Sequence, residues 1–166
     1  FAVRPRTRAD QLYTTYAALG ELAHSSFVFD VDTRLARDPA RLGGARTVWL
    51  PRAEVVDQGL ADALVQWVRG GGTLVVSDPD AFTRTPRNAS LAPVRDVLIG
   101  STVQAAGGSS IRLAPGGIGV GQADPIDLAV RQAGRFAATP ADARVIGTNG
   151  DGTAAVISRS VGAGRV

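Results

Sequence analysis

RTVWLPRAEVVDQGLADALVQWVRGGGTLVVS, which spans Arg46–Ser77, contains two short apolar strands on either side of one amphipathic helix. The strands are expected at Thr47–Leu50 and Thr73–Val76, and the helix at Asp57–Arg69, where a run of three glycines stops it. Four apolar residues of this helix recur at the spacing that places them on one face: Leu60, Leu64, Trp67 and Val68. The order strand, helix, strand predicts a βαβ unit with a right-handed crossover, and therefore an α/β fold that begins with parallel strands.

The chain on both sides of this unit predicts further elements. An amphipathic helix is expected at Asp10–His24, and an apolar strand at Ser26–Phe29. Later in the chain the pattern predicts a helix at Pro93–Gly100 and strands at Ser101–Val103, Ile111–Ala114, Ala143–Gly147 and Thr153–Arg159. Asn-Gly and Asp-Gly pairs join the last two strands and supply the positive φ angles of a hairpin turn. Asp127–Ala133 fits neither a helix nor a strand clearly. The second half is thus expected to be β-rich and partly antiparallel.

Composition narrows the class of protein. Apolar residues make up 45% and charged residues 20% of the 166 residues, which suits one globular domain over 1–166. All 18 basic residues are arginine, and together with the many Ala, Gly and Val residues this bias indicates a GC-rich, actinobacterial genome. No apolar run approaches the ~20 residues that span a bilayer. The net charge is only +3, and the basic cluster Arg4–Arg8 lacks interleaved aromatic residues, so a nucleic-acid partner is not expected.

Two pairs of aspartates follow predicted strand ends. Asp30 and Asp32 follow the strand at Ser26–Phe29, and Asp78 and Asp80 follow Thr73–Val76. Ligands of open parallel sheets bind beyond the carboxyl ends of the strands, and carboxylates there suit Mg²⁺ or Ca²⁺. The competing interpretation, which we favour, is that these aspartates cap turns.

The first of these pairs allows an enzymatic alternative. Residues 27–33, FVFDVDT, resemble the first motif of haloacid-dehalogenase-like phosphatases. The resemblance implies that Asp30 attacks phosphorus with Mg²⁺ bound and that Asp32 acts as acid and base. The sequence departs from that family because Thr33-Arg34 replaces the usual Gly-Thr, the chain has no lysine, and Asp151 lies in the hairpin turn without a second acid.

Ser77 stands where enzymes of related folds carry a nucleophile. No Gly-x-Ser-x-Gly elbow surrounds it, and the chain has one histidine, His24, placed at the end of a predicted helix. The chain contains no cysteine, which excludes a thiolate nucleophile. We therefore expect no hydrolytic triad, and no catalytic residue is assigned. A small-ligand site formed by Asp30, Ser77 and Asp78 remains a further alternative.

Two segments carry a resemblance to a known family. Gly71–Val76, GGTLVV, follows a helix as in the class I glutamine amidotransferase-like fold, and Ala143–Val166 is similar to the closing strands of that fold with their Gly-x-Gly-Arg turn. The chain most closely resembles domains of the β-galactosidase trimerisation type. The resemblance implies a flavodoxin-like or amidotransferase-like three-layer sandwich, of which the parallel βαβ unit is the first half.

The same resemblance sets the functional expectation. The catalytic cysteine and late histidine of true amidotransferases are missing, so the domain is expected to be non-catalytic and to need no cofactor. The resemblance implies an accessory domain for assembly or interaction within a larger, carbohydrate-active, exported bacterial protein. The chain begins at Phe1 without methionine and ends on VGAGRV, which is typical of a domain cut from a longer chain. Expected partners are other domains of that chain and further copies in a homo-oligomer, in an extracellular or cell-envelope location.

Overall fold

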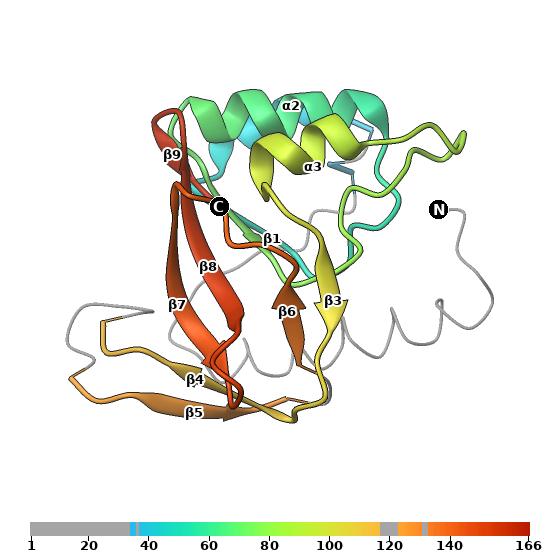
Figure 1. Ribbon diagram of the computed structural model, residues 1–166. Helices are drawn as coiled ribbons and strands as arrows, with labels where there is room; N and C mark the ends of the chain where they lie inside the picture. The colour runs from blue at the N-terminus through green and yellow to red at the C-terminus, as the bar shows by residue number, and fades with distance from the viewer. Residues whose placement is uncertain (1–33, 36, 117–122, 131–132) are drawn as a thin grey trace.

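The computed structural model describes residues 34–35, 37–116, 123–130 and 133–166. Three helical elements and nine strands occur in this part of the chain (Figure 1). The helical elements are the 3₁₀ helix η1 (Pro39–Gly44) and the α-helices α2 (Gln58–Arg69) and α3 (Ala92–Leu98). The strands are β1 (Thr47–Leu50), β2 (Thr73–Val76), β3 (Val103–Ala105), β4 (Ser110–Leu113), β5 (Ile126–Ala129), β6 (Gly134–Phe136), β7 (Ala143–Asn149), β8 (Ala154–Val161) and β9 (Gly164–Arg165).

The main sheet has seven strands and is mixed. Its order is β1-β2-β9-β8-β7-β4-β5, in which β1, β2 and β9 run parallel and all later neighbours pair antiparallel. The sheet curls away from the helices, so that β4 and β5 lie at the end of the molecule farthest from α2 and α3 (Figure 1). Strands β3 and β6 form a separate antiparallel pair. The expected α/β class with a β-rich, partly antiparallel second half is confirmed.

The predicted βαβ unit is present with nearly the predicted bounds. Strands β1 and β2 pair in parallel with Thr47 opposite Thr73. Asp57 precedes α2 and caps it, because its carboxylate accepts a hydrogen bond of 2.9 Å from the backbone N–H of Gly59. The helix ends at Gly70, as the glycine run predicts.

One face of α2 packs into the main core. Its buried residues are Leu60, Ala61, Leu64, Val65 and Val68. They meet Leu74 of β2, Leu98 of α3 and Leu42 of η1 in one cluster. Trp67 lies at the margin of this cluster, where its indole N–H donates to the carbonyl oxygen of Ala45 over 3.3 Å. The periodicity therefore predicted the buried face correctly, with Trp67 at its edge.

The C-terminal turn closes against the end of α2. Ala163 N–H donates to the carbonyl oxygen of Arg69 over 2.9 Å, and Arg165 N–H donates to that of Gly72 over 3.1 Å. A Cβ at Gly164 would collide with the carbonyl oxygens of Val68 and Gly72, so this close approach requires glycine. The Gly-x-Gly-Arg segment thus inserts β9 beside β2.

The second half confirms the predicted hairpin and corrects two strand assignments. Strands β7 and β8 are the longest in the described part of the chain and pair antiparallel. The strand expected at Ser101–Val103 begins later, as β3, and its partner is β6, which the sequence pattern did not predict. The ambiguous Asp127–Ala133 segment contributes to β5. The pairing partner decided each of these bounds, which a local pattern does not reveal.

Arg159 of β8 connects the antiparallel part of the sheet to helix α3. Its Nε donates to both carboxylate oxygens of Asp142, over 2.8 and 2.9 Å. Its guanidinium also donates to the carbonyl oxygens of Asp96 and Val97 near the end of α3, over 3.0 and 2.9 Å. The hydrogen bond from Arg159 is the main reason that the pKa of Asp142 lies below its ordinary value.

The described residues do not confirm a flavodoxin-like three-layer sandwich. Helices α2 and α3 contribute to a single core and lie together in Figure 1. The helix expected at Asp10–His24 and the strand expected at Ser26–Phe29 lie outside the described residues. Within the described ranges, no helix is both long and apolar enough to cross a membrane.

Candidate functional site

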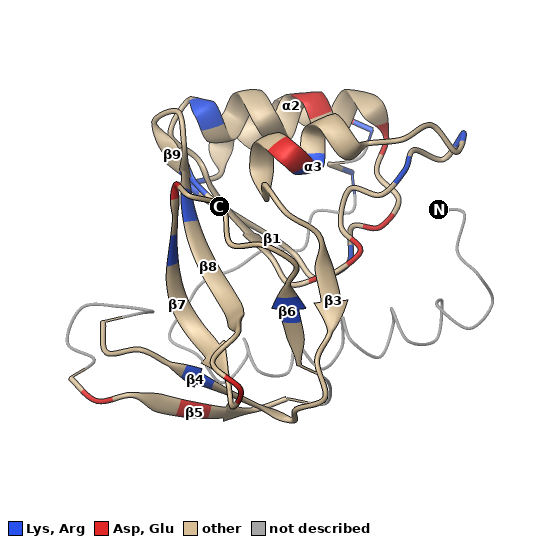
Figure 2. Ribbon diagram, in the orientation of Figure 1, with Lys and Arg blue, Asp and Glu red and all other residues tan. Residues whose placement is uncertain are grey.

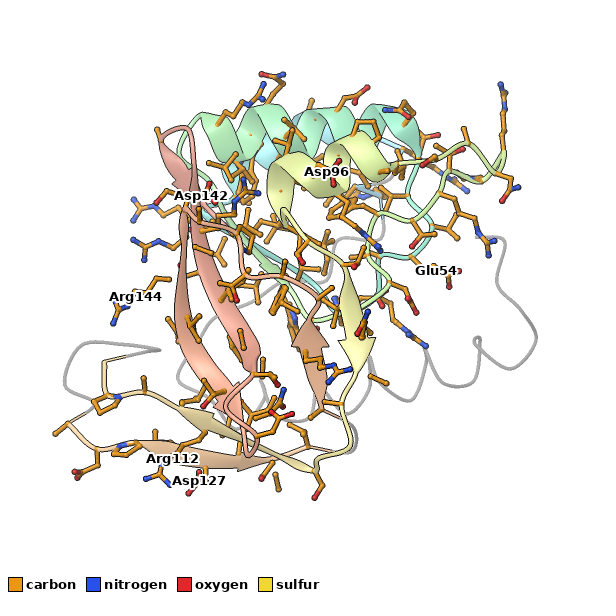
Figure 3. All side chains as sticks on the ribbon, viewed as in Figure 1. Glu54, Asp96, Arg112, Asp127, Asp142 and Arg144 are labelled. Atoms are coloured by element: carbon orange, nitrogen blue, oxygen red, sulfur yellow. The ribbon has the colours of Figure 1, made fainter. Side chains whose placement is uncertain are left out.

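The loops that follow β1 and β2 lie at the carboxyl edge of the parallel strands, where the sequence predicts a site. The two loops are joined by backbone hydrogen bonds. Phe82 N–H donates to the carbonyl oxygen of Ala53 over 2.7 Å, and Val56 N–H donates to that of Arg84 over 3.1 Å. An ion pair of 3.0 Å between Arg84 and Glu54 adds a side-chain link (Figure 3 labels Glu54). Residues 51–57 after β1 and residues 77–91 after β2 are therefore paired with each other, and we call these two segments the double loop.

Asp78 is the residue that organises this double loop. Its side chain is fully buried. One carboxylate oxygen accepts a hydrogen bond of 2.6 Å from Ala53 N–H in the other loop, and the second accepts one of 3.1 Å from Asp80 N–H. Arg52 places a guanidinium nitrogen 3.7 Å from the carboxylate. Both oxygens of Asp78 are thus engaged by the protein itself, and a charge-assisted bond of this kind is stronger than a neutral one.

Asp80 lies in a different environment from Asp78. It is exposed, and its backbone carbonyl accepts a hydrogen bond of 2.6 Å from the hydroxyl of Thr83. Arg95 of α3 supports the same turn, because it donates to the carbonyl oxygen of Ala81 over 2.7 Å and to the hydroxyl of Thr83 over 2.9 Å. One aspartate of the pair therefore points into the loop, and the other faces solvent.

Ser77 is exposed and bonded to a neighbour on the sheet. Its hydroxyl accepts a hydrogen bond of 3.1 Å from the indole N–H of Trp49 on β1. Among the described residues, positive φ angles outside glycine occur at Phe82 and Asn88 and do not include Ser77. A nucleophile elbow needs a strained turn at the nucleophile. Ser77 does not have that geometry, and within the described part of the chain its hydroxyl is bonded to the Trp49 indole and not to a general base.

Several residues of this edge were not predicted from the sequence. Phe82 is fully buried with φ of +56°, a conformation that bulky residues rarely adopt. Glu54 and Arg84 pair across 30 positions, and Arg95 reaches the turn from α3. No local pattern marks them, because their partners belong to other segments. The only feature of the sequence that could have indicated their pairing is that both loops contain charged residues.

The remaining predicted site residues lie elsewhere. Asp30 and Asp32 fall outside the described residues, so their pairing with Asp78 and Asp80 stays a prediction. Asp151 lies in the β7–β8 turn, where its carboxylate accepts bonds of 2.6 and 3.0 Å from the hydroxyl and N–H of Thr153. These bonds lower its pKa. In the described ranges, no group of three or more acidic or histidine side chains is arranged to hold a metal ion.

Charge is dispersed over the described surface. Figure 2 shows arginines and acidic residues interspersed on the helices, the edge loops and the strands. The double loop carries both signs, with Arg52 and Arg84 beside Asp78 and Glu54. This distribution does not single out a strongly charged ligand.

Comparison with known structures identifies the fold. Gan42B, a GH42 β-galactosidase from G. stearothermophilus, matches over 75% of this chain with a TM-score of 0.55 and 15% sequence identity. The cold-adapted β-galactosidase from Rahnella sp. R3 covers 74% at 20% identity, and that from Bacillus circulans sp. alkalophilus covers 72% at 20% identity, both with a TM-score of 0.55. This chain shares its fold with part of these β-galactosidases. It spans 18–19% of their chains. No family model matches the sequence, and no curated protein matches it.

The fold likeness supports part of the sequence-based resemblance. A relation to a domain of β-galactosidases is consistent with the matches. The class I glutamine amidotransferase-like fold is not confirmed by them. At 15–20% identity the likeness concerns the fold and does not transfer an activity.

Proposed function

We propose that this chain is a non-catalytic accessory domain of a larger carbohydrate-active protein, in which it serves assembly or interaction. The observation that carries the proposal is the shared fold with GH42 β-galactosidases, of whose chains it spans 18–19%. A unit of that relative size acts beside other domains. The amidotransferase-like relationship and an extracellular or cell-envelope location belong to the same proposal.

The chemistry of the carboxyl edge supports a structural role. The carboxylate of Asp78 accepts hydrogen bonds at both oxygens, and Ser77 accepts one from Trp49, with no base bonded to it among the residues that the structure describes. The backbone pairing of the two loops fills this edge with intramolecular bonds. We therefore propose that the side chains of Ser77 and Asp78, together with the backbone of Asp80, hold the loops in place.

The parent polypeptide provides the direct test. An antibody raised against the 166-residue chain is used on extracts and culture medium of the source organism, with the detected band assayed in the gel for hydrolysis of a chromogenic β-galactoside. The proposal predicts a polypeptide several times larger than 17.1 kDa that hydrolyses the glycoside. A free polypeptide of about the mass of this chain, without such activity, would contradict it.

The enzymatic alternative has its own assay. The purified chain is incubated with p-nitrophenyl phosphate and Mg²⁺, beside the Asp30→Asn variant and the Asp62→Asn surface control. We expect no turnover above the buffer in any of the three. Hydrolysis that disappears in Asp30→Asn and persists in Asp62→Asn would overturn the non-catalytic assignment.

A further inference from the structure

The outer edge of β5 is an unpaired strand edge in the described part of the chain. Strand β5 is terminal in the seven-stranded sheet and pairs with β4. All four of its residues are exposed, including Ile126 at 39% and Leu128 at 41%. The β4–β5 ribbon lies at the end of the molecule away from α2 and α3 (Figure 1). Exposed edges with apolar side chains are places where another strand pairs.

The ladder with β4 fixes which backbone groups face outward. Val130 N–H donates to the carbonyl oxygen of Ser109 over 2.8 Å, which continues the β4–β5 ladder. Backbone groups alternate in direction along a strand, so those of Leu128 also face β4. The N–H and C=O groups of Asp127 and Ala129 therefore face the open edge. Pro125 has the same orientation but carries no N–H.

A second copy of this chain fits that edge in one register. If Leu128 lies opposite Leu128 of the second copy, then Asp127 of each copy lies opposite Ala129 of the other. Each such pair faces outward and exchanges two hydrogen bonds, which satisfies every outward N–H of β5.

Neighbouring registers satisfy these groups less well. One of these registers places Asp127 opposite Asp127 of the second copy, which sets two carboxylates of like charge against each other. The next places Asp127 opposite Pro125, which lacks a donor. A shift in the other direction places Ala129 opposite Ala129 of the second copy. Ala129 is then the sole outward-facing residue of β5 that pairs with β5 of the second copy.

The side chains agree with the register that centres on Leu128. A non-hydrogen-bonded antiparallel pair brings its Cα atoms to ~4.5 Å, so the two leucines would bury each other. Ile126 lies on the same face of β5. On the other face, Asp127 is 3.4 Å from Arg112 of β4, and this cross-strand pair offsets its charge (Figure 3).

We infer that two copies of this chain pair antiparallel through β5, with Leu128 on the two-fold axis and one sheet continuing across both. This inference deepens the assembly role proposed above and rests on it for its biological setting. A four-residue strand contributes less contact area than a standard stable interface, so the dimer is expected to be weak and to form at high protein concentration. The two-fold pairing occupies the β5 edge of both copies, so no third copy adds through this strand.

Cysteine cross-linking reads the register directly, because the natural chain has no cysteine. Leu128→Cys and Ile126→Cys are each oxidised at high concentration, and the dimer is quantified on non-reducing gels. Leu128→Cys is expected to cross-link at least about tenfold faster, since its copies face each other at a distance that suits a disulfide. Ile126→Cys is the control, because the register places Val130 of the second copy opposite it. Equal rates for the two variants would overturn the inference.

Sedimentation equilibrium of the full 166-residue chain tests the interface energetically. Ala129→Pro removes an outward N–H and leaves the ladder with β4 intact, so the dissociation constant is expected to rise roughly ten- to hundredfold. Leu128→Asp sets two carboxylates across the axis and is expected to abolish the dimer. Val145→Asp changes another exposed apolar residue, 37% accessible on β7, and is expected to leave the dimer intact.

Circular dichroism confirms that each variant is folded, and two outcomes overturn the inference. One is a wild-type chain that stays monomeric at every concentration. The other is a dimer that survives both Ala129→Pro and Leu128→Asp, because it must use another surface. Either result leaves the proposed accessory role standing. A free, short polypeptide in the source organism would overturn that role and leave the cross-linking result unaffected.

Discussion

Strands β2 and β5 are both four residues long, and their surroundings differ completely. Strand β2 lies between β1 and β9, and Leu74 on its helical face is 1% exposed. Strand β5 has one neighbour, and all four of its residues are exposed. Both carry apolar residues, so composition alone does not separate them. The neighbours provided by the fold decide which strand stabilises the chain and which is open to a partner.

The largest contrast is expected between two leucines in these regions. Leu64 on α2 is completely buried over β2, so Leu64→Ala is expected to lower the free energy of unfolding by about 2–5 kcal/mol. Leu128→Ala on β5 is expected to change it by less than about 0.5 kcal/mol in dilute solution. Urea unfolding of both variants measures the difference. Equal losses would show that β5 is as well packed as the helical core.

Closure of the sheet at β9 gives the next largest effect. Gly164→Ala places a Cβ against the carbonyl oxygens of Val68 and Gly72, and is expected to cost about 2–3 kcal/mol through overpacking. Gly150→Ala in the β7–β8 turn is the matched control, since a Cβ there meets no atom within 4 Å. Thermal and urea unfolding compare the two. If both variants unfold like the natural chain, β9 does not pack as closely on α2 as the structure indicates.

The double loop is expected to respond to loss of one charge. Asp78→Asn leaves a buried N–H of Ala53 or Asp80 facing an amide N–H, which should cost about 1–2 kcal/mol of stability. The exposed Asp80→Asn is the control, with an expected change below about 0.5 kcal/mol. Urea midpoints at neutral pH report both values. A stable Asp78→Asn variant would contradict the structural role of this carboxylate and favour its use by a ligand.

The smallest effect concerns pH. The hydrogen bond from Arg159 lowers the pKa of Asp142 in the folded chain below its ordinary value of 3.8. Stabilisation from this pair is therefore fully present above that ordinary value and is lost as the pH falls through the lowered pKa of the folded state. Asp142→Asn should flatten this acid limb of the stability profile, whereas the surface change Asp62→Asn should preserve it. Unfolding midpoints measured at a series of acidic pH values test the point, and identical acid limbs in the natural chain and Asp142→Asn would contradict it.

The parts of the fold that sequence predicted are those with local signals. The helix over α2 follows from the spacing of Leu60, Leu64 and Val68, and its end from the glycine run. The β7–β8 hairpin is indicated by its Asn-Gly and Asp-Gly pairs, although within this turn only Gly152 of the second pair has the expected positive φ, +82°. By contrast, β6 has three residues and pairs with β3, about thirty positions away, so no local pattern indicates it.

The position of the candidate site was predictable, and the favoured interpretation of its aspartates as turn caps agrees with the bond from Asp80 N–H to Asp78; the link from Asp78 to the other loop was not predictable. A carboxylate after a parallel strand is expected at the ligand-binding edge or in a turn, and Asp78 lies there. Its partner, the N–H of Ala53, belongs to the loop after a different strand. Only the tertiary pairing of the two loops shows that both carboxylate oxygens are engaged. The same reason explains why Phe82 and Arg95 were not predicted as parts of this edge.

Backbone amide exchange in a dilution series most directly tests the claim that β2 is enclosed and β5 is open. Thr73 N–H is bonded to Arg46 and Val130 N–H to Ser109, so both are predicted to exchange slowly at every concentration. The outward amides of Asp127 and Ala129 are predicted to exchange fast in the most dilute sample and to become protected as the concentration rises. If Asp127 and Ala129 are as protected as Thr73 in the most dilute sample, the outer edge of β5 is already covered within one chain, and the account is wrong.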